Sequence, residues 1–377
     1  MRSKIKYRLP DSRSSPGSWF LWLLILLALA ALAWVWWHSE KTVEPKKSPA
    51  KNFTATQPAG PLLPSPVLLR TNALPKTSIT PAANNTAGGA FPRAVRDVFE
   101  AQLALDRQGI SSGSLDGKTG SQTRAALRAF QQQEKIPATG ELDAVTKARL
   151  RIAAPPLVNY VVTSNDLARL QPLGKTWLAK SKQTALDYET LLELVAEQSH
   201  AHPVLIRRLN PNVDWTNGIS VGTVLQLPEA ARADPPGKAG FVKISLAEKV
   251  LEAFDAETNL LAHFPCSIAA RFDKRPVGEL HVKAIAPNPN YTFDPDVFPE
   301  SEEARQLKTK LVIPPGPNNP VGTAWISLDK PGYGMHGTPS PELVGRTESH
   351  GCFRLANWNA EFLLKQVWIG MPVYVEP

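Results

Sequence analysis

The chain has 377 residues, of which 43% are hydrophobic and 20% are charged, and it contains 35 prolines against 23 glycines. This length exceeds what one hydrophobic core usually serves, so we expect several ordered modules joined by proline-rich stretches. The net charge of +8 arises from residues 1–90, which hold 11 Lys and Arg against 3 Asp and Glu. Because the rest of the chain is nearly balanced in charge, we expect no nucleic-acid partner.

Residues 19–37 are uncharged and are about as long as a helix that crosses a membrane. Tryptophans stand near both ends of this stretch, and the basic segment 1–18 precedes it. The distribution predicts a transmembrane anchor, a cytoplasmic segment 1–18 and an exported remainder of the chain. The alternative is a cleaved signal peptide, which the bulky residues 34–37 disfavour because cleavage sites require small residues.

Residues 38–91 contain eight prolines among Lys, Ala, Asn and Thr. They lack an apolar period that would bury one face of a helix or strand. The composition therefore predicts a disordered linker that lets the anchored modules reach beyond the membrane.

Residues 92–152 are predicted to form three helices. Apolar residues recur at helical spacing between positions 95 and 103 and again between 123 and 130. Turn-forming residues at 115–120 separate these two helices, and residues 139–143 open the third. The order of turns and helices resembles the small peptidoglycan-binding domain of cell-wall enzymes. A plain three-helix spacer is the alternative.

Residues 157–229 are predicted to form an α+β module. Alternating apolar residues predict strands at 159–162 and 221–227, and two helices are expected within 191–210. The order strand, helix, helix, strand resembles a LysM glycan-binding module. The module departs from that pattern by an insertion around residues 167–187.

Residues 240–377 follow a short break rich in proline and glycine, and their apolar residues alternate with a period of two. The alternation runs through Val242, Ile244 and Leu246 and returns in residues 325–328 and 373–375. The pattern predicts a β-rich domain that is large enough for its own core.

Two short motifs in this domain combine a thiol, imidazoles and glycines. They are Met-His-Gly-Thr at 335–338 and Ser-His-Gly-Cys-Phe-Arg at 349–354. A thiol beside an imidazole suits acyl transfer, because the base takes the thiol proton and favours the nucleophilic thiolate. Glycine lets the backbone approach a tetrahedral intermediate, and nearby amides can donate to its oxyanion.

The two motifs resemble the signature of the YkuD-type L,D-transpeptidases, in which a His-Gly step is followed by Ser-His-Gly-Cys. Likeness at residues 275–280, 320–326 and 354–360 extends the resemblance over the last domain. The resemblance implies a YkuD-like β-sandwich as the catalytic domain.

The same resemblance implies roles for individual residues. Cys352 is the expected nucleophile and His336 the expected general base, with the Gly337 carbonyl orienting the imidazole. Arg354 is expected to order the loop or to pair with a substrate carboxylate. The residues expected around the oxyanion and the substrate are His350, Gly351, Ser349, Gly337 and Arg354. No cofactor and no metal is implied.

The implied reaction is acyl transfer between peptidoglycan stem peptides. Cys352 attacks the carbonyl of the third residue of a tetrapeptide stem, releases the terminal D-alanine and passes the acyl group to an acceptor amine. Stem peptides and glycan strands are the expected partners, and an outer-membrane-attached lipoprotein is one candidate acceptor. The expected location is the bacterial inner membrane, single-pass, with a periplasmic catalytic domain.

Several alternatives remain open at this point. Water could replace the acceptor amine, which would make the enzyme an L,D-carboxypeptidase, or the chain could be a non-catalytic wall-binding scaffold. Cys352 and Cys266 could form a disulfide, although Cys266 is expected to be buried core. A zinc site is disfavoured because the histidines lack the spacing of a helical zinc motif, with His281 the one spare candidate nearby.

Overall fold

The computed structural model describes residues 90–298, 301–307 and 309–377. The predictions for the basic segment, the anchor at 19–37 and the linker up to residue 89 lie outside these ranges. Within them, no helix combines the length and the apolar character that a membrane span requires.

Three helices form the first module: α2 (Val98–Arg107), α3 (Ser121–Gln133) and α4 (Ala144–Arg149). Asp97 and Asp143 cap α2 and α4, because each side chain accepts a hydrogen bond from a backbone amide of the first turn. The short strands β1 (Arg93–Ala94) and β2 (Arg151–Ile152) pair antiparallel and close the module. The prediction of three helices is confirmed.

The second module is built on two antiparallel strands, β3 (Leu157–Val161) and β4 (Val224–Pro228). Two helices lie between these strands in sequence, α7 (Leu191–Gln198) and α8 (Pro203–Leu209), as the apolar pattern predicts. The structure adds two short helices that were not predicted, α5 (Ser164–Ala168) and α6 (Trp177–Ser181). Thr163 and Thr190 start α5 and α7 with capping boxes.

The first two modules share one hydrophobic core, although the sequence suggests separate domains. A single cluster of buried residues includes Leu103 and Leu150 of the first module together with Tyr160 and Leu194 of the second. Neither module therefore buries its apolar surface alone.

The last domain contains an eight-stranded mixed sheet in the order β13-β12-β11-β8-β14-β5-β6-β7. Its strands are β5 (Phe241–Ser245), β6 (Val250–Phe254), β7 (Leu260–Pro265), β8 (Gly278–Pro287), β11 (Ala324–Leu328), β12 (Gly334–His336), β13 (Phe353–Arg354) and β14 (Pro372–Glu376). Neighbouring strands are antiparallel except for the pairs β12–β13 and β14–β5. The prediction of a β-rich domain is confirmed.

The expected β-sandwich needs a correction, because the strands form one curled sheet instead of two separate sheets. Strand β8 explains the difference. Its residues 278–281 pair with β14, and its residues 282–287 pair with β11, where the register shifts beside Ser327 and Leu328. One long strand thus belongs to both halves of the sheet, and the irregularity lets the sheet bend there.

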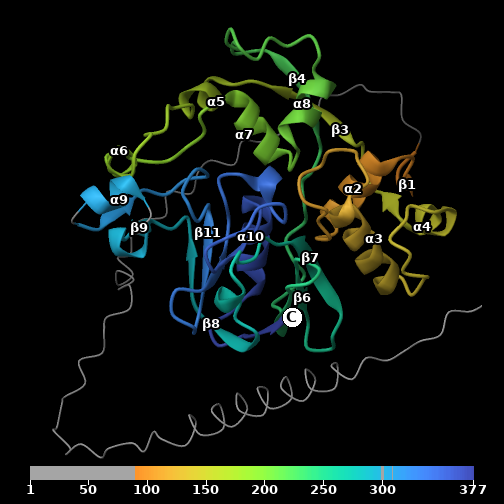
Figure 1. Cartoon of the computed structure of the whole chain (residues 1–377). Helices are drawn as coiled ribbons and strands as arrows, with labels where there is room; N and C mark the ends of the chain where they lie inside the picture. Colours follow the sequence, from red (N-terminus) through yellow and green to blue (C-terminus); the bar gives the residue numbers. More distant parts are fainter. Residues whose placement is uncertain (1–89, 299–300, 308) are drawn as a thin grey trace, which may run out of the picture. The chain divides into compact units, whose positions relative to one another are not determined.

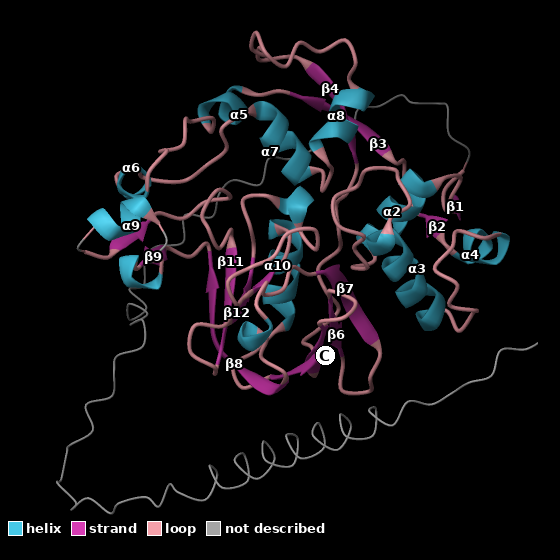
Figure 2. Ribbon diagram, viewed as in Figure 1, coloured by secondary structure: helices cyan, strands magenta, loops and turns pink. Residues whose placement is uncertain are grey.

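Helix α10 (Asn357–Gln366) packs across β8, β11 and β12, as Figures 1 and 2 show. Its residues Ala360 and Leu363 are fully buried in the same core as Ile326 and Met335 of the sheet. A separate strand pair, β9 (Tyr291–Phe293) and β10 (Leu311–Ile313), lies with α9 (Glu302–Gln306) beside α6 (Figure 1). Short 3-10 turns occur at Phe272–Lys274, Pro295–Val297 and Pro341–Leu343.

Candidate active site

The parallel strands β12 and β13 bring the two predicted motifs together. Met335 lies opposite Phe353, and His336 lies opposite Arg354. Because side chains alternate across a sheet, Met335 and Phe353 enter the core while His336 and Arg354 share the other face. Cys352 immediately precedes Phe353, in the bend that leads into β13, and is therefore next in the chain to the residue that pairs with Met335.

His336 is held by its neighbours in one orientation. Its side chain is 4% exposed, and its ring lies against Trp325 of β11 with 5.4 Å between the ring centroids. Its Nδ1 lies 2.6 Å from the carbonyl oxygen of Gly337. Since a carbonyl only accepts, Nδ1 carries the proton and Nε2 presents its lone pair. The expected contact between the Gly337 carbonyl and the imidazole is therefore present.

The Cys352 thiol is half-buried and points to a backbone oxygen. Its Sγ donates to the carbonyl of Gly332 over 3.4 Å. Among the described residues no hydrogen bond joins this thiol to the His336 ring. The thiol is directed to Gly332, and a movement of the Cys352 side chain is needed to bring Sγ toward Nε2.

Both groups are neutral at pH 7 in this arrangement. Burial raises the pKa of the Cys352 thiol to about 11, against the opposing effects of the Gly334 amide and the Arg354 charge. Burial also lowers the pKa of His336 to about 4. The sequence led us to expect a thiolate favoured by the imidazole, whereas burial favours a neutral thiol beside a neutral imidazole.

The residues before Cys352 form a tight turn. Ser349 is buried, and its hydroxyl donates to the Cys352 carbonyl over 2.6 Å and accepts the Gly351 amide at 3.2 Å. The Ser349 side chain and the Gly351 amide are thus engaged within the turn. The Cys352 amide has no acceptor in the part of the chain that the structure describes. The exposed His350 ring points away to Phe298, with 5.7 Å between ring centroids.

Arg354 lies beside a pocket of about 400 Å³. Its guanidinium donates to the carbonyl of Glu348, in the segment before Cys352, over 3.1 Å. Thr338, two residues after His336, lines the same pocket. The pocket therefore borders both motifs.

Residues 239–375 match the YkuD family, the L,D-transpeptidase catalytic domain. Residues 95–150 match the peptidoglycan binding domain. These two matches cover the last domain and the first module, and they agree with the resemblances seen in the sequence.

Individual relatives resemble parts of the chain. The chain is 30% identical over 165 residues to the "Probable L,D-transpeptidase YbiS" of Escherichia coli (strain K12). This alignment covers 44% of this chain and 53% of the relative. The chain is 29% identical over 170 residues to the "Probable L,D-transpeptidase ErfK/SrfK" of Salmonella typhimurium, with the same two coverages of 44% and 53%. The chain thus spans about half the length of these relatives.

A solved structure, L,D-transpeptidase 3 from Mycobacterium tuberculosis, aligns with 42% of this chain and 77% of its own at 16% identity. The TM-score of that alignment is 0.30. The likeness of the YkuD domain to known proteins rests on the family match and the sequence relatives.

One residue that supports the candidate site was missed in the sequence. Asn357, the first residue of α10, is fully buried, and its side-chain oxygen accepts the amides of Thr323 at 3.3 Å and Thr338 at 2.9 Å. A side chain at Gly322 or at Gly337 would overlap this oxygen. Asn357 therefore joins the backbone just after His336 to the backbone just before β11. Its place at a helix start, directly after the cysteine motif, was the available signal.

The amide group of Asn357 reaches the second module. Its Nδ2 donates to Glu197 of α7 over 3.0 Å and to the carbonyl of Pro317 over 3.2 Å. Burial raises the pKa of Glu197 to about 8, so the carboxyl is mostly protonated at pH 7. A residue of the second module, Glu197, thus contacts the asparagine that supports the His336 segment.

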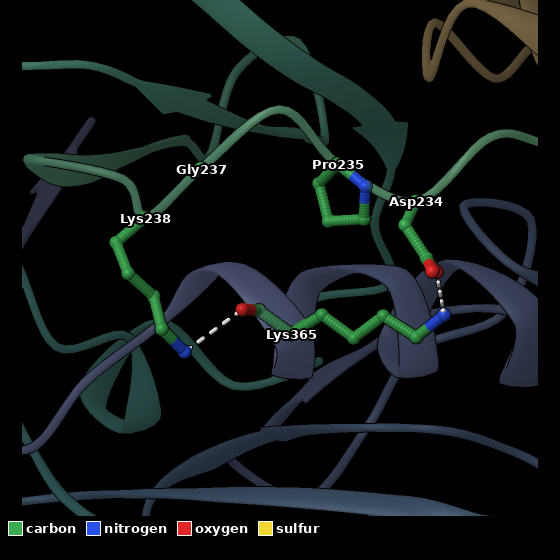
Figure 3. A pocket seen from close by; sticks show the side chains of 5 residues that line it. All are labelled: Asp234, Pro235, Gly237, Lys238 and Lys365. Carbon is green, nitrogen blue, oxygen red and sulfur yellow. Dashed lines mark hydrogen bonds and ion pairs between the residues drawn. The ribbon is translucent and has the colours of Figure 1, made fainter.

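Two further features of the YkuD domain lie apart from this site. Cys266 and Cys352 are both free thiols, so the disulfide alternative is wrong. A second pocket of about 370 Å³ lies where the segment before β5 crosses α10, and Figure 3 shows Lys365 there, paired with Asp234 at 2.6 Å. It contains none of the predicted site residues.

Proposed function

We propose that the chain is a peptidoglycan L,D-transpeptidase in which Cys352 is the nucleophile and His336 the general base. The observation that carries the proposal is the parallel pairing of β12 with β13, which brings the chain segment of Cys352 beside that of His336, whose Nε2 is available. The family match of residues 239–375 supports the same chemistry.

The donor half-reaction starts when the Cys352 side chain turns from the Gly332 carbonyl toward His336. Because the thiol and the imidazole are both neutral, the proton passes from Sγ to Nε2 as Sγ attacks the carbonyl carbon. The carbonyl belongs to the third residue of a tetrapeptide stem. His336 then gives the proton to the leaving amine, so that the C–N bond breaks, D-alanine departs and a thioester remains.

The acceptor half-reaction restores the thiol. An amine of a second stem attacks the thioester carbon, His336 takes the proton from that amine, and the C–S bond breaks as Sγ recovers a proton. The product is a cross-link, or an anchored protein when the amine belongs to a lipoprotein. Water in place of the amine would give a shortened stem.

The oxyanion site is proposed to use the backbone at Cys352. The Cys352 amide is available, whereas the Gly351 amide donates to the Ser349 hydroxyl. We assign Ser349 to holding the turn and Arg354 to the substrate pocket. His350 contributes backbone only, since its ring faces Phe298.

The remaining modules are proposed to hold the enzyme at the cell wall. The uncharged stretch 19–37 supports a single inner-membrane anchor with a periplasmic catalytic domain. The match of residues 95–150 supports binding to peptidoglycan by a module at 92–152. The strand and helix order within 157–229 supports a LysM-like module, and the catalytic domain is assigned to 240–377.

Product analysis with tetrapeptide muropeptides tests the proposal. The wild-type protein is expected to form dimers and release D-alanine, and Cys352→Ser and His336→Ala are each expected to lower the rate by roughly 1000-fold or more. Cys266→Ala is the matched control, since this thiol is fully buried in the core of the sheet and should not be needed for activity.

Mass spectrometry after adding a carbapenem separates the alternatives. An adduct on Cys352 with dimeric products supports the transpeptidase. An adduct with shortened monomers alone would make the enzyme a carboxypeptidase. A folded protein that forms neither adduct nor product would be a scaffold, and the proposal would be wrong.

A further inference from the structure

The insertion of the second module packs against the YkuD domain. The Trp177 ring of α6 stacks on Phe293 of β9 with 4.3 Å between ring centroids. The Leu186 amide donates to the Pro315 carbonyl over 2.8 Å, and the Asn318 amide donates back to the Leu186 carbonyl over 3.0 Å. These contacts from two sides fix the position of the insertion.

This insertion forms one wall of the pocket beside the catalytic motifs. Trp177 and Lys180 of α6 line the pocket of about 400 Å³ together with Thr338, Ser340 and Arg354. The first two come from the second module, and the others come from the segments that carry His336 and Cys352. The pocket is therefore complete only when both parts of the chain are present.

The charge of the pocket is positive. Lys180 and Arg354 both line it, and no Asp or Glu is among the described residues of its wall. Lys180 lies over the Trp177 ring at 5.5 Å, which positions its ammonium group, and within the described ranges neither cation pairs with a carboxylate. Two unpaired cations in a pocket attract a carboxylate ligand.

We propose that Lys180 binds a carboxylate of the stem peptide, so that the insertion supplies a specificity-determining residue of the active site. The inference rests on the proposed function and adds a substrate feature to it. Stem peptides carry free carboxylates, and Arg354 is placed to share the same ligand. Lys180 acts in binding, because it lies outside the two motifs that carry the reacting groups.

The experiment uses steady-state kinetics of the full chain with tetrapeptide muropeptides. Lys180→Ala is expected to raise KM by about 10-fold with kcat changed less than about 2-fold, since one charge-assisted contact is lost. Lys180→Glu is expected to raise KM further, and Lys180→Arg to keep it near the wild-type value. Lys182, exposed at the end of the same helix and outside the pocket, supplies the matched controls Lys182→Ala and Lys182→Glu.

A second substrate with its side-chain carboxylates amidated gives an independent readout. Amidation is expected to raise KM of the wild type by about 10-fold or more and to raise KM of Lys180→Ala by a smaller factor, because only the contact with Arg354 is then left to lose. Equal KM values for the Lys180 and Lys182 variants would overturn the assignment of Lys180 while the transpeptidase activity stands. A wild type without product and without a carbapenem adduct would overturn both proposals.

Discussion

At the scale of single residues, burial determines the protonation of the thiol and the imidazole. The pKa of Cys352 is raised to about 11 and that of His336 is lowered to about 4, so the pair is neutral over the physiological range. A neutral thiol is a weak nucleophile until a base removes its proton. The reactivity of Cys352 therefore depends on substrate binding and on the turn of its side chain toward His336.

Alkylation with iodoacetamide reports this protonation state directly. We expect the rate at Cys352 to rise about tenfold per pH unit from pH 7 to about pH 11, because only the thiolate reacts. Peptide mapping by mass spectrometry would follow Cys352 and distinguish it from the buried Cys266. His336→Ala should change the rate at pH 7 by less than about 3-fold.

A rate that levels off below pH 8 would contradict this prediction. It would mean that a thiolate and an imidazolium already coexist in the resting enzyme, in which case His336→Ala would slow alkylation strongly.

Several properties of single residues could be predicted from the sequence. The two motifs predict Cys352 and His336 as the reacting groups, and the expected contact of His336 with the Gly337 carbonyl is present. The direction of the thiol pKa shift was not predictable, because burial depends on elements that are distant in the sequence. Lys180 was missed for the same reason, since nothing in the sequence places the insertion beside Arg354.

At the scale of elements, the amino-terminal end of α10 supports the His336 segment. Asn357 joins the backbone amides of Thr323 and Thr338 to Glu197 of α7. One side chain thus fixes the strand segments before β11 and after β12 and links them to the second module.

Replacement of this side chain should affect both folding and rate. Asn357→Ala leaves two largely buried amides without an acceptor, which costs roughly 2 to 4 kcal/mol of stability. It also releases the Gly337 region, so we expect kcat to fall about 10-fold to 100-fold with a smaller change in KM. Thermal melts and muropeptide kinetics on the same samples measure the two effects.

Glu197→Gln is the control, because glutamine keeps an oxygen that accepts from Asn357. At pH 5 the variant and the wild type should have the same melting temperature. The folded pKa of Glu197, about 8, lies above its ordinary value of 4.5, so the wild type loses stability as the pH rises from 4.5 through 8. At pH 9 the glutamine variant should therefore be relatively more stable than at pH 5. An equal difference at both pH values would show that the carboxyl is not buried in this way.

The elements themselves were predictable to different degrees. Alternation revealed the strands around residues 242–246 and 325–328, and helical spacing revealed α2, α3, α7 and α8, because each buries one face. The five-residue helices α5 and α6 are too short to show a period. The single curled sheet was also not predictable, since it depends on how the long strand β8 divides its partners between β14 and β11.

At the scale of the whole described chain, three parts meet at one carboxylate. Asp106 of α2 is fully buried and accepts from His200 of the second module over 2.7 Å and from Arg232, which precedes the last domain. Burial alone would raise the pKa of Asp106, but the charges of Arg232 and His200 outweigh it and lower the pKa to about 2. Together with the shared core, this contact predicts that the parts unfold as one unit.

Calorimetry of the full chain tests this expectation. The described part should unfold in a single transition, and Asp106→Ala should destabilise it by roughly 3 to 5 kcal/mol, because Arg232 then stays buried without its partner. Asp234→Ala is the matched control: its side chain is 82% exposed in a surface pair with Lys365, and the cost should stay within about 1 kcal/mol.

The pH dependence follows from the lowered pKa of Asp106. Its stabilisation is present above the ordinary value of 3.8 and is lost as the pH falls through about 2. The melting difference between wild type and Asp106→Ala should shrink accordingly in acid. Two resolved transitions in the wild type would instead mean that the modules unfold independently.

The crowding of Gly322, Gly337 and Asn357 around one oxygen constrains how the gene can change. A substitution that adds even a methyl group at either glycine would place it against the Asn357 side chain. Loss of Asn357 would leave the backbone amides of Thr323 and Thr338 without an acceptor. We therefore expect every single substitution at Gly322, Gly337 or Asn357 to reduce stability. Among descendants of this gene, the three positions should be inherited together or replaced together.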